Sequence, residues 1–448
     1  MGAAADRLTG LAAAPDRFDI PFDDLRQAQI DAANERFQER RSTGMLLGHR
    51  ATAAGITLLR DRSEMLPLLF PHTVYKSYAE SWLGEKRWDR LNAWLDALSS
   101  HPVSGADASD VPDIDEWILR LGAAGHNVSC TSGTDGKSAL LSASAADMTW
   151  SKHDTVAAFA WGSGTVPQRD RVMFPLSPLA RIPRNFAVRG ALTEAYADPR
   201  VESFAYPVPP ISIGDITGMV MLRKRIAGGN ASTDEITVYE TMVKARLDGA
   251  SKAIGVAAAA LIRMRGHKLF LSGMWATLFR VAETVRRMGY KAQHFHPENT
   301  VYIARGPKGV VLPPDHRSYV FETFNITPDH AFQIYGMQEI NSALPRCGAG
   351  RYHAPPWLVC LLLDPSADNL LPVQSGEMEG RAAFLDLSLD GRWGGVISGD
   401  RIAVDYGPCA CGNQGPSIRD DITRYADLPG GDRINGADAI DIYLSREA

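Results

Sequence analysis

Residues 131–137 combine the residue types that bind phosphate. They read Thr-Ser-Gly-Thr-Asp-Gly-Lys and follow a short lead-in at 128–130. Small residues let backbone N–H groups approach an anion closely, hydroxyls add donors, and lysine adds positive charge. The loop is not of the G-x-x-x-x-G-K-[ST] type, because Thr131 stands where that pattern requires its first glycine. It predicts a phosphate site, with a solvent-exposed turn between two strands as the alternative.

Three later segments extend this pattern in a fixed order along the chain. Residues 333–340 read Gln-Ile-Tyr-Gly-Met-Gln-Glu-Ile, residues 397–401 read Ile-Ser-Gly-Asp-Arg, and residues 409–412 read Cys-Ala-Cys-Gly. Together with the loop they resemble the motifs of the adenylate-forming superfamily, which includes acyl-CoA synthetases, luciferase and nonribosomal adenylation domains. Residues 335–339 are similar to its Y-G-x-T-E motif, with Gln338 where threonine is usual. The cysteine segment, with Gly415, Pro416 and Arg424 after it, resembles phenylacetate-CoA ligases.

One further segment points to a branch of that superfamily. Residues 304–309, Ala-Arg-Gly-Pro-Lys-Gly, resemble the acyl-protein synthetases, which feed fatty acyl groups to bacterial luciferase reductases. The resemblance covers residues 70–428. It implies an α/β fold: the large N-terminal domain of adenylate-forming enzymes, with layered sheets and helices and a small β-rich subdomain, and with the mobile C-terminal domain largely absent.

The local patterns predict the elements that must position these motifs. Residues 23–40 have few apolar positions and predict a surface helix, while 85–98 has apolar residues at helical spacing. Ser232 and Glu235 have the spacing of a capping box that opens a helix to about 264. Further expected elements are strands at 172–174, 268–272, 301–303 and 357–363, a helix at 275–288, and antiparallel hairpins over 378–406.

The domain organisation expected from these patterns has four parts. They are a helical N-terminal region packed on the core (1–125), an α/β core (126–375), a β-rich subdomain (376–428) and a short C-terminal tail in place of the usual mobile domain (429–448).

The resemblance implies the activity and the cofactors. A carboxylate attacks the α-phosphate of ATP, pyrophosphate leaves, and a thiol captures the acyl-adenylate. Mg²⁺ would be held by Glu339, and the catalytic residues would be Lys137 and Glu339. The remaining ATP-binding residues would be Thr131, Ser132, Gly133, Thr134, Gly136, Tyr335, Gly336, Met337, Gln338, Asp400 and Arg424. The substrate pocket would include Trp161, His294 and Gly306.

The C-terminal end of the sequence departs from the family pattern. Family members carry a late lysine that contacts the substrate carboxylate and the α-phosphate, whereas the last lysine here is Lys308. Three explanations stay open. Another cation, such as Lys137, Lys308 or Arg401, takes over that work; a partner protein supplies the second domain; or the chain is a degenerate adenylation fold that binds nucleotide or acyl-adenylate as a partner subunit.

The cysteines and histidines allow several interpretations. Five cysteines in this length do not form a disulfide framework. Cys409 and Cys411 could accept an acyl group, could bind zinc together with Cys347 and His353, or could be plain thiols in a turn, which is the leading interpretation. His294 and residue 296 would share one face if they lay on a strand, as a metal pair or a polar contact to substrate.

Composition excludes several other partners. Lys plus Arg is 47 and Asp plus Glu is 52, which gives a net charge of -5 and disfavours a nucleic-acid partner. No segment reaches the roughly 18 apolar residues that a membrane span needs. The sequence therefore predicts a reduced cytoplasmic ligase acting on a carboxylic acid and a thiol acceptor, which would be CoA, a carrier protein or a protein cysteine.

Overall fold

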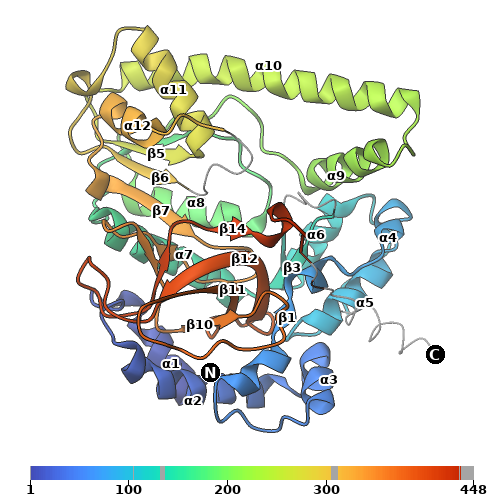
Figure 1. The fold of residues 1–448 in the computed structure, drawn as a ribbon. Helices are drawn as coiled ribbons and strands as arrows, with labels where there is room; N and C mark the ends of the chain where they lie inside the picture. The colour runs from blue at the N-terminus through green and yellow to red at the C-terminus, as the bar shows by residue number, and fades with distance from the viewer. Residues whose placement is uncertain (1, 104, 132–136, 304–310, 433, 435–448) are drawn as a thin grey trace. The chain divides into compact units, whose positions relative to one another are not determined.

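The computed structural model describes residues 2–103, 105–131, 137–303, 311–432 and 434 (Figure 1). The chain is a mixed α/β protein that divides into two compact units. Unit 1 comprises residues 1–154 and 336–448, and unit 2 comprises residues 155–335. Helix α7, Ala145–Ser163, begins in the first unit and ends in the second. Within the described ranges, no helix is both long enough and apolar enough to cross a bilayer.

Unit 1 contains the helices that precede α7 and most of the β-structure. Its helices are α1 (Ala3–Thr9), α2 (Phe22–Arg40), α3 (Met45–Ala53), α4 (Glu80–Gly84), α5 (Trp88–Leu98) and α6 (Ile114–Ala123), with short 3₁₀ turns at Gly10–Ala13, Ser63–Leu68, His72–Lys76 and Tyr425–Asp427. Its strands are β1 (Phe70–Pro71), β2 (Asn127–Cys130), β3 (Leu140–Ala143), β8 (Leu344–Pro345), β9 (Arg351–His353), β10 (Leu358–Leu363), β11 (Glu377–Asp386), β12 (Gly395–Asp405), β13 (Ser417–Arg419) and β14 (Thr423–Arg424).

The main sheet of unit 1 has the strand order β10-β11-β12-β13-β9, and β1 and β14 pair with β12. Strands β10, β11 and β12 are antiparallel, which confirms the hairpins expected over 378–406. All six residues of β10 are buried, as its continuous apolar run predicts. Strands β2 and β3 form a separate antiparallel hairpin. The predicted phosphate-binding segment, residues 131–137, follows β2 and precedes β3 in the sequence.

Helix α2 corrects one expectation. The sequence predicted a surface helix because the segment is poor in apolar residues, but nine of its residues are buried. Arg36 donates from Nε to the carbonyl oxygen of Leu387 (3.1 Å), and Arg40 donates from Nη1 to the carbonyl oxygen of Arg392 (2.7 Å). Buried guanidinium groups are tolerated where backbone carbonyls accept their hydrogen bonds. The helix therefore packs partly through buried polar groups, which a search for apolar periodicity does not detect.

Unit 2 is built around four parallel strands in the order β4-β5-β6-β7. They are β4 (Val172–Pro175), β5 (Leu269–Gly273), β6 (Thr300–Ile303) and β7 (Ala331–Tyr335). The helices of this unit are α8 (Pro183–Tyr196), α9 (Ile213–Ala227), α10 (Thr233–Arg263), α11 (Trp275–Arg287) and α12 (His316–Phe324), with 3₁₀ turns at Ala292–His294 and Pro328–His330. Their shared core is apolar and buried, and includes Leu261, Leu271, Trp275, Val301 and Phe324. The strands and helices expected in this region are confirmed.

Helix α10 begins as its sequence predicted. The Ser232 side chain accepts a hydrogen bond from the Glu235 backbone (3.2 Å), and the Glu235 carboxylate accepts one from the Ser232 backbone (2.8 Å). This reciprocal capping box satisfies two backbone donors at the helix start. Figure 1 shows α10 as the long helix that runs beside α11. Its buried residues fall between 253 and 262, and the Glu235 carboxylate in its first turn forms an ion pair with Arg225 of α9.

Candidate functional site

The phosphate-type loop connects the two strands of the β2–β3 hairpin. Of its predicted contact residues, the structure describes Thr131 and Lys137, and Ser132, Gly133, Thr134 and Gly136 lie outside the described residues. Two hydrogen bonds between Thr131 and Ala139 close the base of the loop. The Thr131 backbone donates to the Ala139 carbonyl (3.1 Å), and the Ala139 backbone donates to the Thr131 hydroxyl oxygen (2.9 Å). Thr131 therefore braces the loop, and its hydroxyl proton remains able to donate.

Tyr78 positions the lysine of this loop. The Lys137 ammonium donates to the Tyr78 carbonyl oxygen and lies 4.2 Å from the centroid of the Tyr78 ring, a cation–π distance. The Tyr78 hydroxyl donates to the Ser138 carbonyl oxygen (2.8 Å), and its ring packs edge-on against Trp94. Burial raises the pKa of Tyr78, so the phenol stays protonated as a donor. The sequence analysis missed Tyr78, which belongs to no motif.

Arg392 ties the loop hairpin to the segment that carries Glu339. Its buried guanidinium donates to the Ser142 carbonyl oxygen of β3 (2.5 Å). It also donates to the carbonyl oxygens of Gln338 (2.9 Å) and Glu339 (3.0 Å). A planar guanidinium with five donors is suited to hold several carbonyls at once. The structure thus joins two motifs that are about 200 residues apart, and no local sequence signal marks Arg392.

The chain after Glu339 is held by a second buried group, the Asp386 carboxylate. It accepts hydrogen bonds from the backbones of Asn341 (2.7 Å) and Ser342 (2.9 Å), and from the Ser342 hydroxyl (2.9 Å). The backbone of Ala343 donates in turn to the carboxylate of Asp154 (2.8 Å). Charge-assisted bonds of this kind are shorter and stronger than neutral ones. They leave the Glu339 backbone little freedom, as a preorganised ligand site requires.

Asp400 and Arg424 are direct cross-strand partners. They face each other in the antiparallel pair formed by β12 and β14. The Asp400 backbone donates to the Ser398 hydroxyl oxygen (2.8 Å), a local hydrogen bond within β12. Opposed residues on paired strands have Cβ atoms about 5 Å apart, so both side chains can reach one ligand. The structure brings together these two predicted residues, which are 24 positions apart.

His72 lies close to the Asp432 carboxylate and feels the charge of two further carboxylates. It follows β1, which pairs with β12, and its Nε2 atom lies 3.7 Å from the Asp432 carboxylate. Burial lowers the pKa of His72, while the negative charges of Asp432, Glu339 and Asp400 act in the opposite direction. The charges of Glu339 and Asp400, two predicted ligand-binding residues, thus both influence the same imidazole. His72 is a further residue that the sequence analysis missed.

The side chains at 338 and 339 fit a hard cation bound to phosphate. Glu339 offers a carboxylate and is 9% exposed. The Gln338 side-chain oxygen is buried, and no residue that the structure describes hydrogen-bonds to it. Mg²⁺ takes oxygen ligands, commonly one or two carboxylates together with substrate phosphates. Glu339 would hold the ion and Gln338 would accept from its water shell, and the bound ion would neutralise phosphate charge.

The predicted site residues of unit 2 lie on different secondary-structure elements. Tyr335 ends β7 and is buried, and Trp161 is half-buried in the last turn of α7. Gly306 lies outside the described residues. The strand considered for His294 and His296 is wrong, because His294 ends a 3₁₀ turn. Each imidazole Nδ1 accepts a local backbone N–H, from Lys291 and Glu298 respectively (3.1 Å in both cases), so the rings stabilise their own turns.

The cations proposed to replace the late lysine differ in their surroundings. Lys137 is directed to Tyr78, as described above. Arg401 forms an ion pair with Glu379 on the exposed side of β12. Lys308 lies outside the described residues. Lys137 is therefore the one of the three that the structure places both in a predicted motif and beside a buried scaffold.

Comparison with solved structures finds the same fold in 2-hydroxyisobutyryl-CoA ligase. Its open conformation, in complex with 2-HIB-AMP and CoA, aligns at 13% identity over 94% of this chain and 79% of that chain, with a TM-score of 0.52. Its postadenylation state, in complex with R3-HIB-AMP, aligns at 13% identity over 96% of this chain and 74% of that chain, with a TM-score of 0.56. No protein-family model and no curated protein matches the sequence. The chain therefore shares its α/β fold with this CoA ligase.

Proposed function

We propose that this protein activates a carboxylic acid with ATP to an acyl-adenylate and transfers the acyl group to a thiol. The observation that carries the proposal is the Arg392 link, which fixes the segment of Glu339 to the hairpin of Lys137. Adenylation requires a phosphate cradle, a cation ligand and a ribose ligand in one rigid frame. Asp400 and Arg424, which are cross-strand partners, would supply the third component.

The first step is a displacement at the α-phosphorus. A carboxylate oxygen of the acid forms a new bond to that phosphorus, the bond to the bridging oxygen of the β-phosphate breaks, and pyrophosphate leaves with the electron pair. Lys137 would stabilise the charge that accumulates on the leaving pyrophosphate. Asp400 would accept hydrogen bonds from the ribose hydroxyls, and Glu339 would hold Mg²⁺. Positioning and charge stabilisation provide most of the rate gain in phosphate chemistry of this kind.

The second step transfers the acyl group. A thiolate attacks the acyl carbon, the carbon–oxygen bond to phosphate breaks, and AMP leaves. We favour CoA as the acceptor over a carrier protein or a protein cysteine, because the ligase with the same fold is known in complex with CoA. A short hydroxy acid is the first candidate for the acid substrate, beside fatty and aryl acids.

A coupled assay tests this proposal. The purified chain is incubated with ATP, Mg²⁺, CoA and each of a panel of hydroxy, fatty and aryl acids, and acyl-CoA and AMP are quantified by mass spectrometry. We expect equimolar acyl-CoA and AMP with one class of acid. Glu339→Gln should reduce the rate by about 100-fold because a charged cation ligand is lost. The exposed Glu85→Gln serves as the matched control and should leave the rate unchanged.

The alternative of a binding subunit gives a different result in the same assay. A degenerate adenylation fold would gain thermal stability from ATP or an acyl-adenylate without producing AMP, because ligand binding alone stabilises the native state. Detection of AMP that depends on both the acid and Glu339 would exclude it. Thermal stabilisation by ATP together with no AMP from any acid would contradict the enzyme proposal and favour the subunit.

A further inference from the structure

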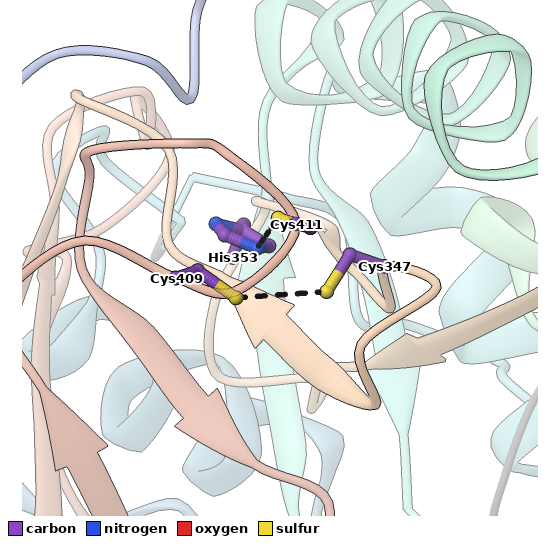
Figure 2. Close-up of side chains that lie close together, drawn as sticks. All are labelled: Cys347, His353, Cys409 and Cys411. Atoms are coloured by element: carbon purple, nitrogen blue, oxygen red, sulfur yellow. Dashed lines mark hydrogen bonds between the residues drawn. The ribbon is translucent and has the colours of Figure 1, made fainter.

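Three cysteines and one histidine of unit 1 converge on a single point (Figure 2). The ligand atoms of Cys347, His353, Cys409 and Cys411 all lie within 4.8 Å of one another. The Cys347 and Cys409 sulfurs are 3.9 Å apart, and the Cys411 sulfur is 3.3 Å from His353 Nε2. Cys347, His353 and Cys409 are buried, whereas Cys411 lies at the surface. The four side chains come from two segments, residues 347–353 and 409–411, which are separated by more than 50 residues.

Two of the distances between these atoms match tetrahedral coordination. With zinc–sulfur bonds near 2.3 Å and zinc–nitrogen bonds near 2.0 Å, tetrahedral angles place two sulfurs about 3.8 Å apart and a sulfur and a nitrogen about 3.5 Å apart. The observed 3.9 Å and 3.3 Å lie close to these values. A disulfide would need sulfurs about 2.05 Å apart. The geometry thus fits a shared ion better than a bond between two of the thiols.

Both turns are shaped by the backbone so that they present their sulfurs. The Cys409 backbone donates to the Asn413 carbonyl (2.8 Å), and the Gly412 backbone donates to the Cys409 carbonyl (2.9 Å). Gly412 has a φ of 100°, in the region that favours glycine. In the other turn the Cys347 backbone donates to the Arg351 carbonyl (2.8 Å). Each turn is therefore braced by its own hydrogen bonds.

The surroundings also provide outer contacts to the cluster. The Asn413 amide donates to the Cys411 sulfur (3.2 Å), an interaction that would stabilise a thiolate. His353 is held in β9, which pairs with β13 just after the cysteine turn. The ring of Phe18 lies 5.9 Å from the His353 ring, and the Gly415 backbone donates to the Phe18 carbonyl (3.0 Å). The cluster thus joins two turns of the sheet and the segment before α2.

We propose that Cys347, His353, Cys409 and Cys411 bind one structural Zn²⁺ ion. Soft thiolates and an imidazole select zinc over Mg²⁺ or Ca²⁺, and four protein ligands leave no open position for catalysis. Binding releases the three thiol protons to solvent and leaves a site with a net charge of −1. The ion fastens the 347–353 turn to the 409–412 turn. This inference does not depend on the proposed ligase activity.

Metal analysis of the full chain tests the site. Protein produced with zinc in the medium and purified without chelator should contain about one zinc per chain by mass spectrometry of the elements. Replacement by Co²⁺ should produce the thiolate-to-cobalt charge-transfer and tetrahedral d–d bands of a cysteine-rich site. A chain that carries no stoichiometric zinc and, with its thiols reduced, develops none of these bands with Co²⁺ would overturn the proposal. A Cys347–Cys409 disulfide found by mass spectrometry of native peptides would also overturn it.

Two variants locate the ion and separate binding from folding. Cys411→Ser changes the one ligand at the surface, so the fold should persist while zinc content and the cobalt charge-transfer intensity both fall. Cys360→Ala removes a buried thiol of β10 that is not in the cluster, and it should keep one zinc. Chelation should lower the melting temperature of the unmodified chain, and added Zn²⁺ should restore it. Equal zinc content in Cys411→Ser and the unmodified chain would contradict the assignment of this ligand.

Discussion

Arg392 shows how much of the candidate site depends on one side chain. Arg392 is 2% exposed, and its guanidinium donates hydrogen bonds to three backbone carbonyls from two distant segments. Three carbonyls that share one cation lose their partner together when that cation is removed. Buried acceptors without partners cost more free energy than the hydrogen bonds themselves contribute on average. The residue is therefore a positioning residue whose loss acts through Glu339.

Arg392→Met should lower both stability and activity. We expect the free energy of unfolding to fall by about 3 kcal/mol, because the orphaned carbonyls cannot be solvated in the interior. Chemical denaturation with urea measures this change. The same substitution at the exposed Arg41 is the matched control and should change stability by less than about 0.5 kcal/mol. Equal effects in the two variants would show that the Arg392 contacts carry no net stability.

Asp400 offers a prediction about the nucleotide alone. If its carboxylate accepts from the ribose, Asp400→Asn should raise the KM for ATP by about 10-fold and leave the KM for the acid nearly unchanged, because a hydrogen bond to a charged acceptor is weakened. Steady-state kinetics with each substrate varied in turn provide the measurement. Asp405→Asn, at the far end of β12, is the control. If Asp400 had only a structural role, the Asp400→Asn substitution would change the KM for ATP and the KM for the acid together, or neither of them.

At the scale of elements, most of the confirmed predictions concern elements that depend on residues close together in the sequence. The strands of unit 2 and the capping box of α10 depend on neighbours within a few residues, so a pattern of types reveals them. Helix α2 was misjudged because its buried face includes Arg36 and Arg40, whose acceptors lie about 350 residues away. The partners of His72 and Arg392 also lie far away in sequence, at separations from 53 to 360 residues. A contact between a single polar residue and a distant partner produces no periodic pattern in the sequence. Such contacts therefore could not be predicted from periodicity.

The start of α10 provides a matched pair of substitutions. Ser232→Ala removes the cap and should reduce the local stability of the first turn by about 1 kcal/mol, whereas Ser251→Ala, in the exposed interior of the same helix, should stabilise it slightly because alanine is the better helix former. Amide hydrogen exchange of residues 234–237 measures the first effect. Unchanged protection in Ser232→Ala would mean that tertiary contacts, and not the cap, hold this end.

At the scale of the whole molecule, the described motifs are divided between two units. Unit 1 contains the described part of the loop, Glu339, Asp400 and Arg424, and unit 2 contains Tyr335, Trp161 and His294. The ligase fold was predictable from ordered motifs, since four short segments in sequence order were sufficient to indicate it. The identity of the acid substrate was not predictable, because no sequence motif marks the residues that would bind the acid. Activity therefore has to be measured.

The most direct measurement is the acid-dependent exchange of labelled pyrophosphate into ATP. This exchange reports reversible formation of an acyl-adenylate and requires no thiol acceptor. We predict exchange with one class of acid, reduced about 100-fold in Lys137→Ala and unchanged in Lys152→Ala, a surface lysine of α7. Absence of exchange with every acid, from a folded chain that binds ATP, would contradict the central claim that this protein forms acyl-adenylates.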